Sequence, residues 1–328
     1  MSVNKKTVFV LGAGASVPYD FPSGLTLRTN IIEGFRTDAS RLYSSDPIDP
    51  RRRNLLRSVD LFVKRFKDSQ INIDLFLTRR QGEYTEIGKV AIFNKIIQAE
   101  QNYLNEIENR ATLDHSSDWL YWFFNHYTGG LLDISEIDKM LDMNYAFITF
   151  NYDRLIEYYL ERALMANWAK GDKEIDSIHS ALNKIPIHHV YGSLGRLVWQ
   201  KENKETVVKF GDSFDYINMH KHISNIDIIH GDRGKENIEK TRNELKEAHK
   251  VFFLGFGFAP ENLEQLGIPG VFKESNPVVY ATALGCCNGE IRKIEKALSP
   301  DKSHCSNVTV QDMDCLDRKS TRLNSSHY

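Results

Sequence analysis

The chain has 328 residues, of which 42 are lysine or arginine and 44 are aspartate or glutamate, so its formal net charge is −2 at pH 7. This balance excludes the basic excess of a general nucleic-acid-binding protein, and no apolar run reaches the roughly 18–20 residues that a membrane-spanning helix needs. With 41% hydrophobic and 26% charged residues, the composition indicates a globular protein of one large or two modest domains.

The cysteines and the first residues bear on the compartment. The four cysteines (Cys286, Cys287, Cys305 and Cys315) show no C-x-x-C spacing, which favours reduced thiols over a disulfide framework or a zinc ribbon. The first residues lead into a strand pattern rather than into a signal-peptide core. We therefore expect a cytoplasmic protein whose partners include neither a membrane nor a nucleic acid.

The first predicted element is a strand over residues 7–11, whose sequence TVFVL has almost no polar alternation. Such a run is typical of a strand buried on both faces of a parallel sheet. The glycine-rich sequence GAGAS follows at residues 12–16. Gly12 permits a tight turn, and Gly14 allows the backbone and the following N–H groups to approach a diphosphate. Because Val17 stands where a third glycine would complete G-x-G-x-x-G, a plain strand and turn remains the alternative.

The middle of the chain has a helical pattern. A helix is expected near residues 25–35, and residues 37–53, with two prolines and three consecutive arginines, are interpreted as a solvated linker. Apolar residues then recur every three or four positions over residues 54–127. The aromatic face at 119–127 is interpreted either as core or as a surface for assembly. We predict a helical insertion, or a small helical domain, over residues 36–139.

Strand and helix patterns alternate in the remainder of the chain. Alternation of this kind predicts an α/β fold with a Rossmann-like, doubly wound parallel sheet. The predicted core comprises residues 1–35 and 140–315, and residues 316–328 are interpreted as a disordered tail or a cloning scar. Strands are expected at 145–150, 187–190, 251–254, 278–282 and 308–310, with weaker strand patterns at 197–199, 206–210 and 226–229.

Four of the predicted strands end in glycine-rich or polar sequences. Ligands of such sheets bind outside the carboxyl ends of the strands, so these ends are the candidate site. Each end also has a simpler interpretation: Asn151 and Asp153 fit helix capping, His189 fits a hydrogen-bonded core position, and the glycines fit turns. The four ends lie at residues 12–16, 149–153, 189–195 and 255–258.

The order and content of these ends resemble the sirtuin-like family over residues 5–300. The resemblance is carried by GAGAS at 12–16, FPSG at 21–24, TFNYD at 149–153, YGSL at 191–194 and LGFGF at 254–258. It is closest to the prokaryotic branch whose members act in anti-phage defence by destroying NAD, and it implies NAD as the substrate. The positions that the resemblance assigns to nucleotide binding are Gly12, Ala13, Gly14, Ser16, Asp153, Tyr191, Gly192, Gly255 and Gly257.

The resemblance also implies partners, and the sequence differs from the family pattern at two points. It implies a homo-oligomer and a HerA-type ATPase or another defence-system partner. Deacylating sirtuins carry a four-cysteine zinc module that this chain lacks, so no metal is expected and peptide deacylation is the least favoured activity. Tyr191 stands where the family has the histidine of His-Gly-Ser-Leu. His189 precedes it by two residues, so on a strand it would share a face with Tyr191 and reach the same cleft.

The predicted chemistry is cleavage of the glycosidic bond between nicotinamide and ribose. The leaving group is already cationic, so no general acid is needed, and the transition state is oxocarbenium-like. Asn151 is expected to orient water or the ribose hydroxyls, because an amide both donates and accepts. His189 is expected to accept a hydroxyl proton. The predicted function is an NAD glycohydrolase; the alternatives are a catalytically silent sensor of NAD or ADP-ribose derivatives and, less favoured, a protein deacylase.

Overall fold

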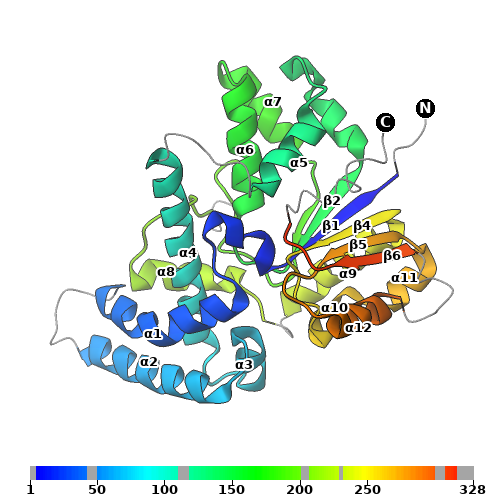
Figure 1. Cartoon of the computed structure of the whole chain (residues 1–328). Coiled ribbons are helices and arrows are strands. Elements are labelled where there is room, and N and C mark those ends of the chain that lie inside the picture. The colour runs from blue at the N-terminus through cyan, green and yellow to red at the C-terminus, as the bar shows by residue number, and fades with distance from the viewer. Residues whose placement is uncertain are drawn as a thin grey trace.

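In the described residues of the computed structural model, parallel strands form one six-stranded sheet with helices on both faces (Figure 1). The structure describes residues 5–42, 50–109, 118–200, 207–228, 232–299 and 307–315. The strands are β1 (Thr7–Leu11), β2 (Tyr145–Thr149), β3 (Ile187–His189), β4 (Lys250–Leu254), β5 (Val278–Thr282) and β6 (Val308–Gln311). The predicted α/β fold with a parallel sheet is confirmed.

The sheet has the order β3-β2-β1-β4-β5-β6. Leu11 at the end of β1 lies opposite Thr149 of β2 and Leu254 of β4, so these three strands end level with one another. The chain adds strands on one side of β1 up to β3, and on the other side from β4 onward. This is the strand order of a Rossmann fold, in which the ligand crevice lies where the order reverses, beyond β1 and β4.

Alternate residues of β1 enter two separate cores. Val8 and Val10 pack in the core on one face, and Phe9 and Leu11 in the core on the other. All four are buried, which explains why TVFVL lacks polar alternation.

Different helices cover the two faces of the sheet, as Figure 1 shows. The core that contains Phe9 is closed by α5 (Trp119–Thr128), α6 (Leu155–Trp168) and α7 (Asp172–Leu182), with the 3-10 segment η3 (Ile134–Met143). The core that contains Val8 is closed by α9 (Asp232–Glu247), α10 (Pro260–Leu266), α11 (Gly270–Ser275) and α12 (Asn288–Leu298).

A group of helices lies beyond the carboxyl end of β1 (Figure 1). Their buried phenylalanines, among them Phe35, Phe62, Phe66 and Phe76, continue the core that contains Val8. The group comprises α1 (Gly24–Leu42), α2 (Pro50–Ser69), α3 (Ile73–Arg79), α4 (Thr85–Asn109) and α8 (Tyr216–His222), and η5 (Ile223–Asn225) follows α8. The helical pattern predicted for this region is confirmed, whereas the division of the chain into domains stays a prediction.

The linker predicted over residues 37–53 is wrong where the structure describes it. Helix α1 continues to Leu42 because Ile31, Phe35 and Ala39 form a buried stripe at four-residue spacing. Pro50 begins α2, where its fixed φ and missing N–H are tolerated at the first helical position. Residues 43–49 lie outside the described residues, as does the predicted tail at 316–328.

The weaker strand patterns are also wrong within the described residues. Residues 197–200 form a turn, closed by the N–H of Gln200 on the carbonyl of Leu197 at 3.0 Å. Only isolated bridges occur nearby, between Arg196 and Val207 and between Gly192 and Ile226. Several apolar side chains of these segments are buried although their backbone is irregular, so the apolar pattern reflects burial and not strands. These side chains are Leu197, Trp199, Val208 and Ile226.

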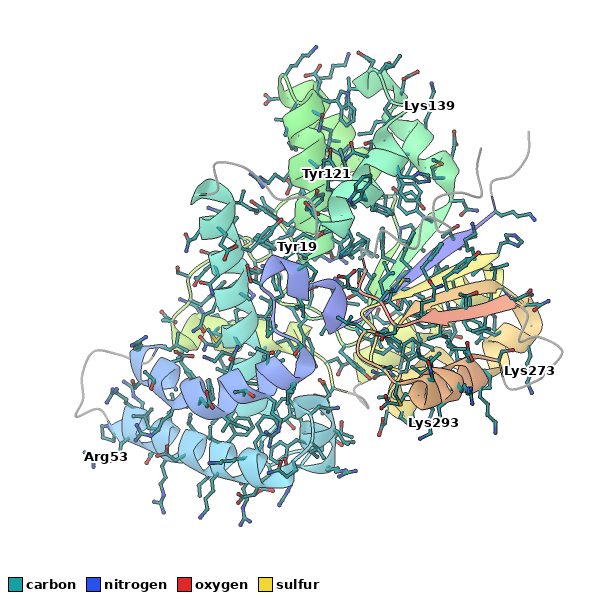
Figure 2. The ribbon with its side chains drawn as sticks, viewed as in Figure 1. Tyr19, Arg53, Tyr121, Lys139, Lys273 and Lys293 are labelled. Carbon is teal, nitrogen blue, oxygen red and sulfur yellow. The ribbon has the colours of Figure 1, made fainter. Side chains whose placement is uncertain are left out.

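The surface agrees with the near balance of charges. Figure 2 shows the basic side chains of Arg53, Lys139, Lys273 and Lys293 at the outer surface of the molecule. Among the helices that the structure describes, none combines the length and the apolar character needed to cross a membrane.

Candidate functional site

The loop that follows β1 interlocks with the loop that follows β4. The N–H of Gly12 donates to the carbonyl of Leu254, and that of Gly14 to the carbonyl of Gly255, each at 3.0 Å. A Cβ at Gly12 would lie 2.4 Å from the carbonyl oxygen of Gly255, and one at Gly255 would lie 2.1 Å from the nitrogen of Ala15. Gly255 also has φ +57°, which disfavours other residues. These glycines therefore allow backbone to pack directly on backbone.

Several N–H groups of this loop donate to carbonyls within the chain. Besides Gly14, Ala15 donates to the carbonyl of Gly12 at 2.9 Å, and Ser16 donates to the carbonyl of Ala13 at 3.1 Å. These three groups close the short 3-10 segment η1 (Ala13–Ala15) and its contact with β4. In this conformation these three groups donate within the chain, and the nucleotide-binding role of Gly12, Ala13, Gly14 and Ser16 stays a prediction.

Asn151 joins this loop from the end of β2. Its Nδ2 donates to the carbonyl of Gly12 at 3.1 Å and to Oγ of Ser16 at 3.0 Å. The bond to a carbonyl fixes which end of the amide faces Gly12, because only the NH₂ group can donate there. The residue is 8% exposed, and its Oδ1 is a buried atom without a hydrogen-bond partner among the described residues. Such an orphaned acceptor points to an unrecorded donor, such as a water or a ligand hydroxyl.

His189 lies next to Asn151, held between two acceptors. Its Nδ1 lies 3.0 Å from the backbone carbonyl of Asn151, and its Nε2 lies 2.8 Å from Oε1 of Glu157 in α6. Both ring nitrogens therefore donate when the imidazole is protonated. Burial alone lowers the pKa of His189, but the Glu157 carboxylate and the Asn151 carbonyl outweigh burial, so the pKa is raised. In this conformation the ring offers no lone pair to a ligand, and its predicted role as a proton acceptor stays a prediction.

Two buried carboxyl groups, Glu157 and Asp153, complete a cluster with Asn151 and His189. Burial would raise the pKa of Glu157, but the neighbouring His189 outweighs it and holds the pKa below its usual value. Asp153 accepts from the N–H of Leu155 at 3.2 Å, but the N-cap of α6 is Arg154, so Asp153 lies one residue before the capping position that the sequence suggested. Burial raises the pKa of Asp153 to about 6, although Leu155, Ser16 and His189 act in the opposite direction. Asp153, a carboxyl group whose pKa lies near neutral pH, therefore belongs to the same cluster as the imidazole of His189 and the amide of Asn151.

Tyr191 lies away from His189, contrary to the prediction that the two share a cleft. Strand β3 ends at His189, so the two-residue period does not extend to Tyr191. The hydroxyl of Tyr191 donates to Oδ1 of Asn262 in α10 at 2.9 Å, while His189 bonds to Glu157 in α6. These helices cover opposite faces of the sheet. Tyr191 is buried and packs edge-on against Phe150.

The two remaining predicted glycines differ in surroundings. Gly192 has φ +70°, and a Cβ there would lie 2.0 Å from the carbonyl oxygen of Asn225, so this turn requires glycine. At Gly257 a Cβ would meet no atom within 4 Å, which leaves open space at that position.

A cavity of about 680 Å³ adjoins the cluster along the outer edge of β3. Its size lies within the range of small-molecule sites. Two buried polar atoms of its lining residues, Nε1 of Trp199 and Oδ2 of Asp227, have no hydrogen-bond partner in the described part of the chain. The residues that line it include Glu157, His189, Gly192, Ser193, Trp199 and Asp227, but not Asn151.

The match to a known family falls on this cluster. Residues 145–280 match the family model of the SIR2-like domain. The match runs from the start of β2 into β5 and supports a Sir2-like family, whose members are generally NAD-dependent enzymes. An NAD-related function is therefore indicated for the chain. No curated protein matches the sequence significantly.

Sequence reasoning missed a member of the cluster, Glu157, which lies within the segment that matches the family model. The signal was available, because this glutamate lies between the inward-facing Ile156 and Leu160 of an amphipathic helix. A carboxylate at a core-facing position is buried only when it is paired, and Glu157 is 4% exposed against His189. Over the described ranges, no group of three or more His, Cys, Asp or Glu residues has the arrangement of a metal site.

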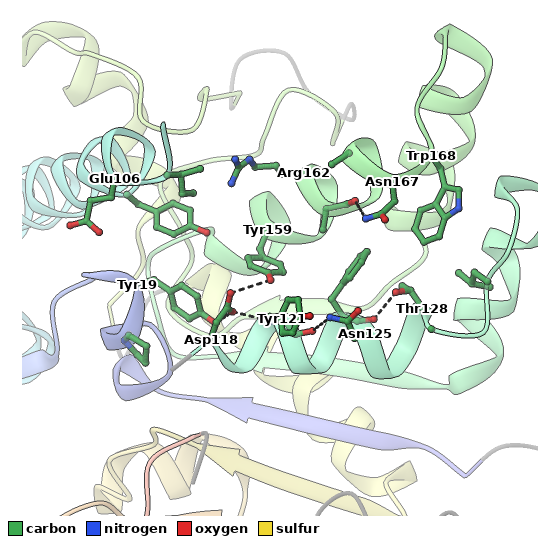
Figure 3. Close-up of a pocket in the computed structure, with 18 of the residues that line it drawn as sticks. Tyr19, Glu106, Asp118, Tyr121, Asn125, Thr128, Tyr159, Arg162, Asn167 and Trp168 are labelled. Carbon is green, nitrogen blue, oxygen red and sulfur yellow. Dashed lines mark hydrogen bonds between the residues drawn. The ribbon is translucent and has the colours of Figure 1, made fainter. Parts of the chain in front are cut away.

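A second cavity, of about 560 Å³, is lined by residues 18–20, which follow the loop after β1, and by residues of α4, α5 and α6 (Figure 3). Tyr19, in the 3-10 segment η2 (Val17–Tyr19), and Tyr159 in α6 both donate to the carboxylate of Asp118, at 2.7 and 3.4 Å. Nε1 of Trp119 donates to the carbonyl of Ala15 at 2.7 Å. Helix α5 thus supports the same loop that Asn151 contacts.

Proposed function

We propose that the protein hydrolyses NAD⁺ to nicotinamide and ADP-ribose. The observation that carries the proposal is the buried amide of Asn151, whose Oδ1 lacks a partner within the described residues, at the sheet edge where Rossmann folds bind nucleotides. A water or ribose hydroxyl donating to this oxygen would satisfy it. The match of this segment to the SIR2-like domain supports NAD as the nucleotide.

The reaction needs little from the protein in acid–base terms. The bond between C1′ of the ribose and the pyridinium nitrogen breaks, and its electron pair neutralises the nicotinamide. Water adds to C1′ and releases one proton, so the products are nicotinamide, ADP-ribose and H⁺. The transition state carries positive charge on the ribose, which the nearby carboxylates of Asp153 and Glu157 stabilise.

The cluster divides these tasks among its residues. Asn151 orients the water or ribose hydroxyl through Oδ1, because Nδ2 is already engaged by Gly12 and Ser16. His189 is a positioning residue that holds the backbone carbonyl of Asn151 at 3.0 Å. The cavity beside His189 gives the nucleotide a route to the cluster.

The test is an incubation of the purified full chain with NAD⁺, in which nicotinamide is followed by chromatography. We expect Asn151→Ala to lower kcat by about 10²–10³-fold, the usual effect of removing one positioned polar group from a charged transition state. The matched control is Asn167→Ala, since Asn167 is exposed on α6 and its side chain, within the described residues, donates to the carbonyl of Ala163 in its own helix. Nicotinamide release that is equal in the two variants would refute the assignment of Asn151.

A catalytically silent sensor of NAD or ADP-ribose derivatives is the second candidate. It is favoured by the position of Tyr191, which bonds to Asn262 and lies away from His189. Calorimetry with NAD⁺ and with ADP-ribose distinguishes the candidates, because a sensor binds without releasing nicotinamide. An acyl-peptide assay tests the third candidate, a protein deacylase.

The cellular role proposed with this activity is that of a cytoplasmic anti-phage effector that depletes NAD. We propose assembly into a homo-oligomer and a HerA-type ATPase, or another defence-system protein, as partner. Sedimentation velocity measures the assembly, and nicotinamide release with and without the product of the neighbouring gene tests for activation. Cellular NAD that stays constant during infection would contradict this role.

A further inference from the structure

The turn between β2 and α6 sends four consecutive side chains in four directions. Asn151 reaches the loop after β1, and Asp153 accepts from the N–H of Leu155 at the start of α6. Tyr152 reaches Asp74 in α3, and Arg154 reaches Glu100 in α4. The turn that presents Asn151 is therefore tied to two helices that lie outside the SIR2-like match at residues 145–280.

The pair between Arg154 and Glu100 is almost completely buried. The side chains are 1% and 0% exposed, and the guanidinium meets the carboxylate through Nε at 3.0 Å and a terminal nitrogen at 2.6 Å. The remaining donors of Arg154 bond to backbone carbonyls of Gly195, Val208 and Lys209. These are five hydrogen bonds, as many as a guanidinium can donate, so the side chain has one fixed position.

The contact between Tyr152 and Asp74 is the second tie. Tyr152 is 5% exposed, and its hydroxyl donates to Oδ1 of Asp74 in the first turn of α3. The N-cap of this helix is fixed in turn, because Oδ1 of Asn72 accepts from the N–H of Leu75 at 2.8 Å. Tyr152 thus anchors the residue next to Asn151 to a capped helix end.

Asn151 makes its own side-chain bonds only to the loop after β1 in the described structure, through Nδ2. The direction of its Oδ1 therefore depends on how the neighbouring backbone is held. We infer that Asp74 and Glu100 are positioning residues for Asn151, an inference that rests on the proposed function. Helices α3 and α4 then act from outside the reacting groups, since they orient the turn that presents Asn151 through Tyr152 and Arg154.

The test uses the tyrosine contact, because removal of Glu100 would leave a buried guanidinium unpaired and endanger folding. Tyr152→Phe removes only the hydroxyl that bonds to Asp74. The matched control is Tyr145→Phe, since Tyr145 is also 5% exposed and its hydroxyl has no partner in the described residues. Asp74→Asn is the conservative variant, because its amide oxygen still accepts from Tyr152.

Two readouts are measured on the full chain: the kinetics of nicotinamide release, and hydrogen exchange of the peptide over residues 149–160. We expect Tyr152→Phe to lower kcat by about tenfold or more with KM changed less than about twofold, because small displacements of a reacting group cost rate rather than binding. Exchange in the peptide speeds up in the same variant. Tyr145→Phe changes neither quantity, and Asp74→Asn stays close to the wild type in both.

The outcomes separate this inference from the proposed function. If Tyr152→Phe matches Tyr145→Phe in kcat and in exchange, the inference is wrong. A fall in the unfolding temperature with unchanged kcat would assign Asp74 a structural role alone and would also overturn it. If the wild type releases no nicotinamide, the proposed function fails, and the exchange comparison alone decides whether Asp74 holds the turn.

Discussion

Asn151 and Gly12 are 139 positions apart in the chain, yet Nδ2 of Asn151 donates to the carbonyl of Gly12 at 3.1 Å. The neighbouring strands β1 and β2 bring them together, and the N–H of Phe150 reinforces the contact by donating to the carbonyl of Leu11 at 3.0 Å. One end of the amide therefore stabilises the loop, while its other end, Oδ1, is unpartnered in the described residues. A single side chain thus links the architecture of the sheet edge to its chemistry.

The interlocked glycines predict a large difference between two similar substitutions. Gly255→Ala places a Cβ 2.1 Å from the nitrogen of Ala15 at φ +57°, so we expect the free energy of unfolding to fall by at least about 2 kcal/mol. Gly257→Ala meets no atom within 4 Å and is expected to change it by less than about 1 kcal/mol. Urea unfolding of both variants measures the difference, and equal stabilities would contradict the backbone contact between the two loops.

The pair between His189 and Glu157 predicts a pH dependence. Because the pKa of His189 is raised, the pair stabilises the fold fully below the ordinary histidine pKa of about 6.5 and loses this effect as pH rises through the raised value. Glu157→Gln removes the charge that outweighs burial, so the ring loses its proton at lower pH. We expect the alkaline fall in stability and in nicotinamide release to move to lower pH.

The matched control for this prediction is Glu161→Gln. Glu161 also lies in α6 and pairs with a histidine, His179, at 3.1 Å, but away from Asn151. Unfolding in urea and nicotinamide release are measured over a series of pH values for both variants. A shift of the alkaline limb that is the same in the two variants would show that the Glu157 pair has no special role.

The sheet was predictable because its strands are short apolar runs, and burial on both faces leaves a strong signal in the sequence. The helical stripe of α1 shows the opposite case. Ile31, Phe35 and Ala39 continue past the predicted end of the helix, but prolines and arginines dominated the composition of residues 37–53. A four-residue period carried by one side chain per turn is easily outweighed by such local composition.

The sequence predicted which residues of the candidate site lie close together, but not where their side chains point. Sequence reasoning brought Asn151, Asp153 and His189 to one edge, and the structure joins them. It placed Tyr191 with His189, because the end of β3 and the positive φ of Gly192 leave no pattern that a strand period can detect. The partner of Gly12 and Gly14 was equally hidden, since glycine indicates conformational freedom without indicating which distant backbone uses it.

The raised pKa of Asp153 predicts a second fall of stability with rising pH, in a lower pH range than that of the His189 pair. With a pKa of about 6 in the fold and about 3.9 in the unfolded chain, the folded state binds the extra proton between these values, so stability falls as pH rises through them. Above pH 6 the shifted pKa of Asp153 lowers the free energy of unfolding by about 3 kcal/mol. Asp153→Asn keeps an acceptor for the N–H of Leu155 and removes the charge.

We therefore expect Asp153→Asn to be more stable than the wild type at pH 8 and to lose this advantage near pH 4. Urea unfolding over this range measures the difference between the two proteins. A constant difference across the range would contradict the assignment, because only a titrating Asp153 produces one that changes with pH. Nicotinamide release by the same variant is expected to fall, since the carboxylate beside the ribose is lost.

The aromatic helix α5 provides the last prediction, which bears on the two interpretations of residues 119–127. Phe123 is 7% exposed and packs against Phe9 and Phe147 at 5.4 and 5.2 Å between ring centroids, whereas Trp122 is 48% exposed. Most of this face is therefore core, and Trp122 is the residue with a large exposed ring. Phe123→Ala is expected to cost about 3–5 kcal/mol of unfolding free energy. Trp122→Ala is expected to cost less than about 0.5 kcal/mol.

Sedimentation velocity of Trp122→Ala then tests the interpretation as an assembly surface. If copies of the chain associate through this face, truncation of the exposed ring lowers the sedimentation coefficient at a given concentration while the unfolding free energy stays constant, because an exposed aromatic side chain contributes to a subunit contact and not to the core. An unchanged sedimentation coefficient removes α5 from the proposed homo-oligomer contact and leaves it as the support of the loop at Ala15.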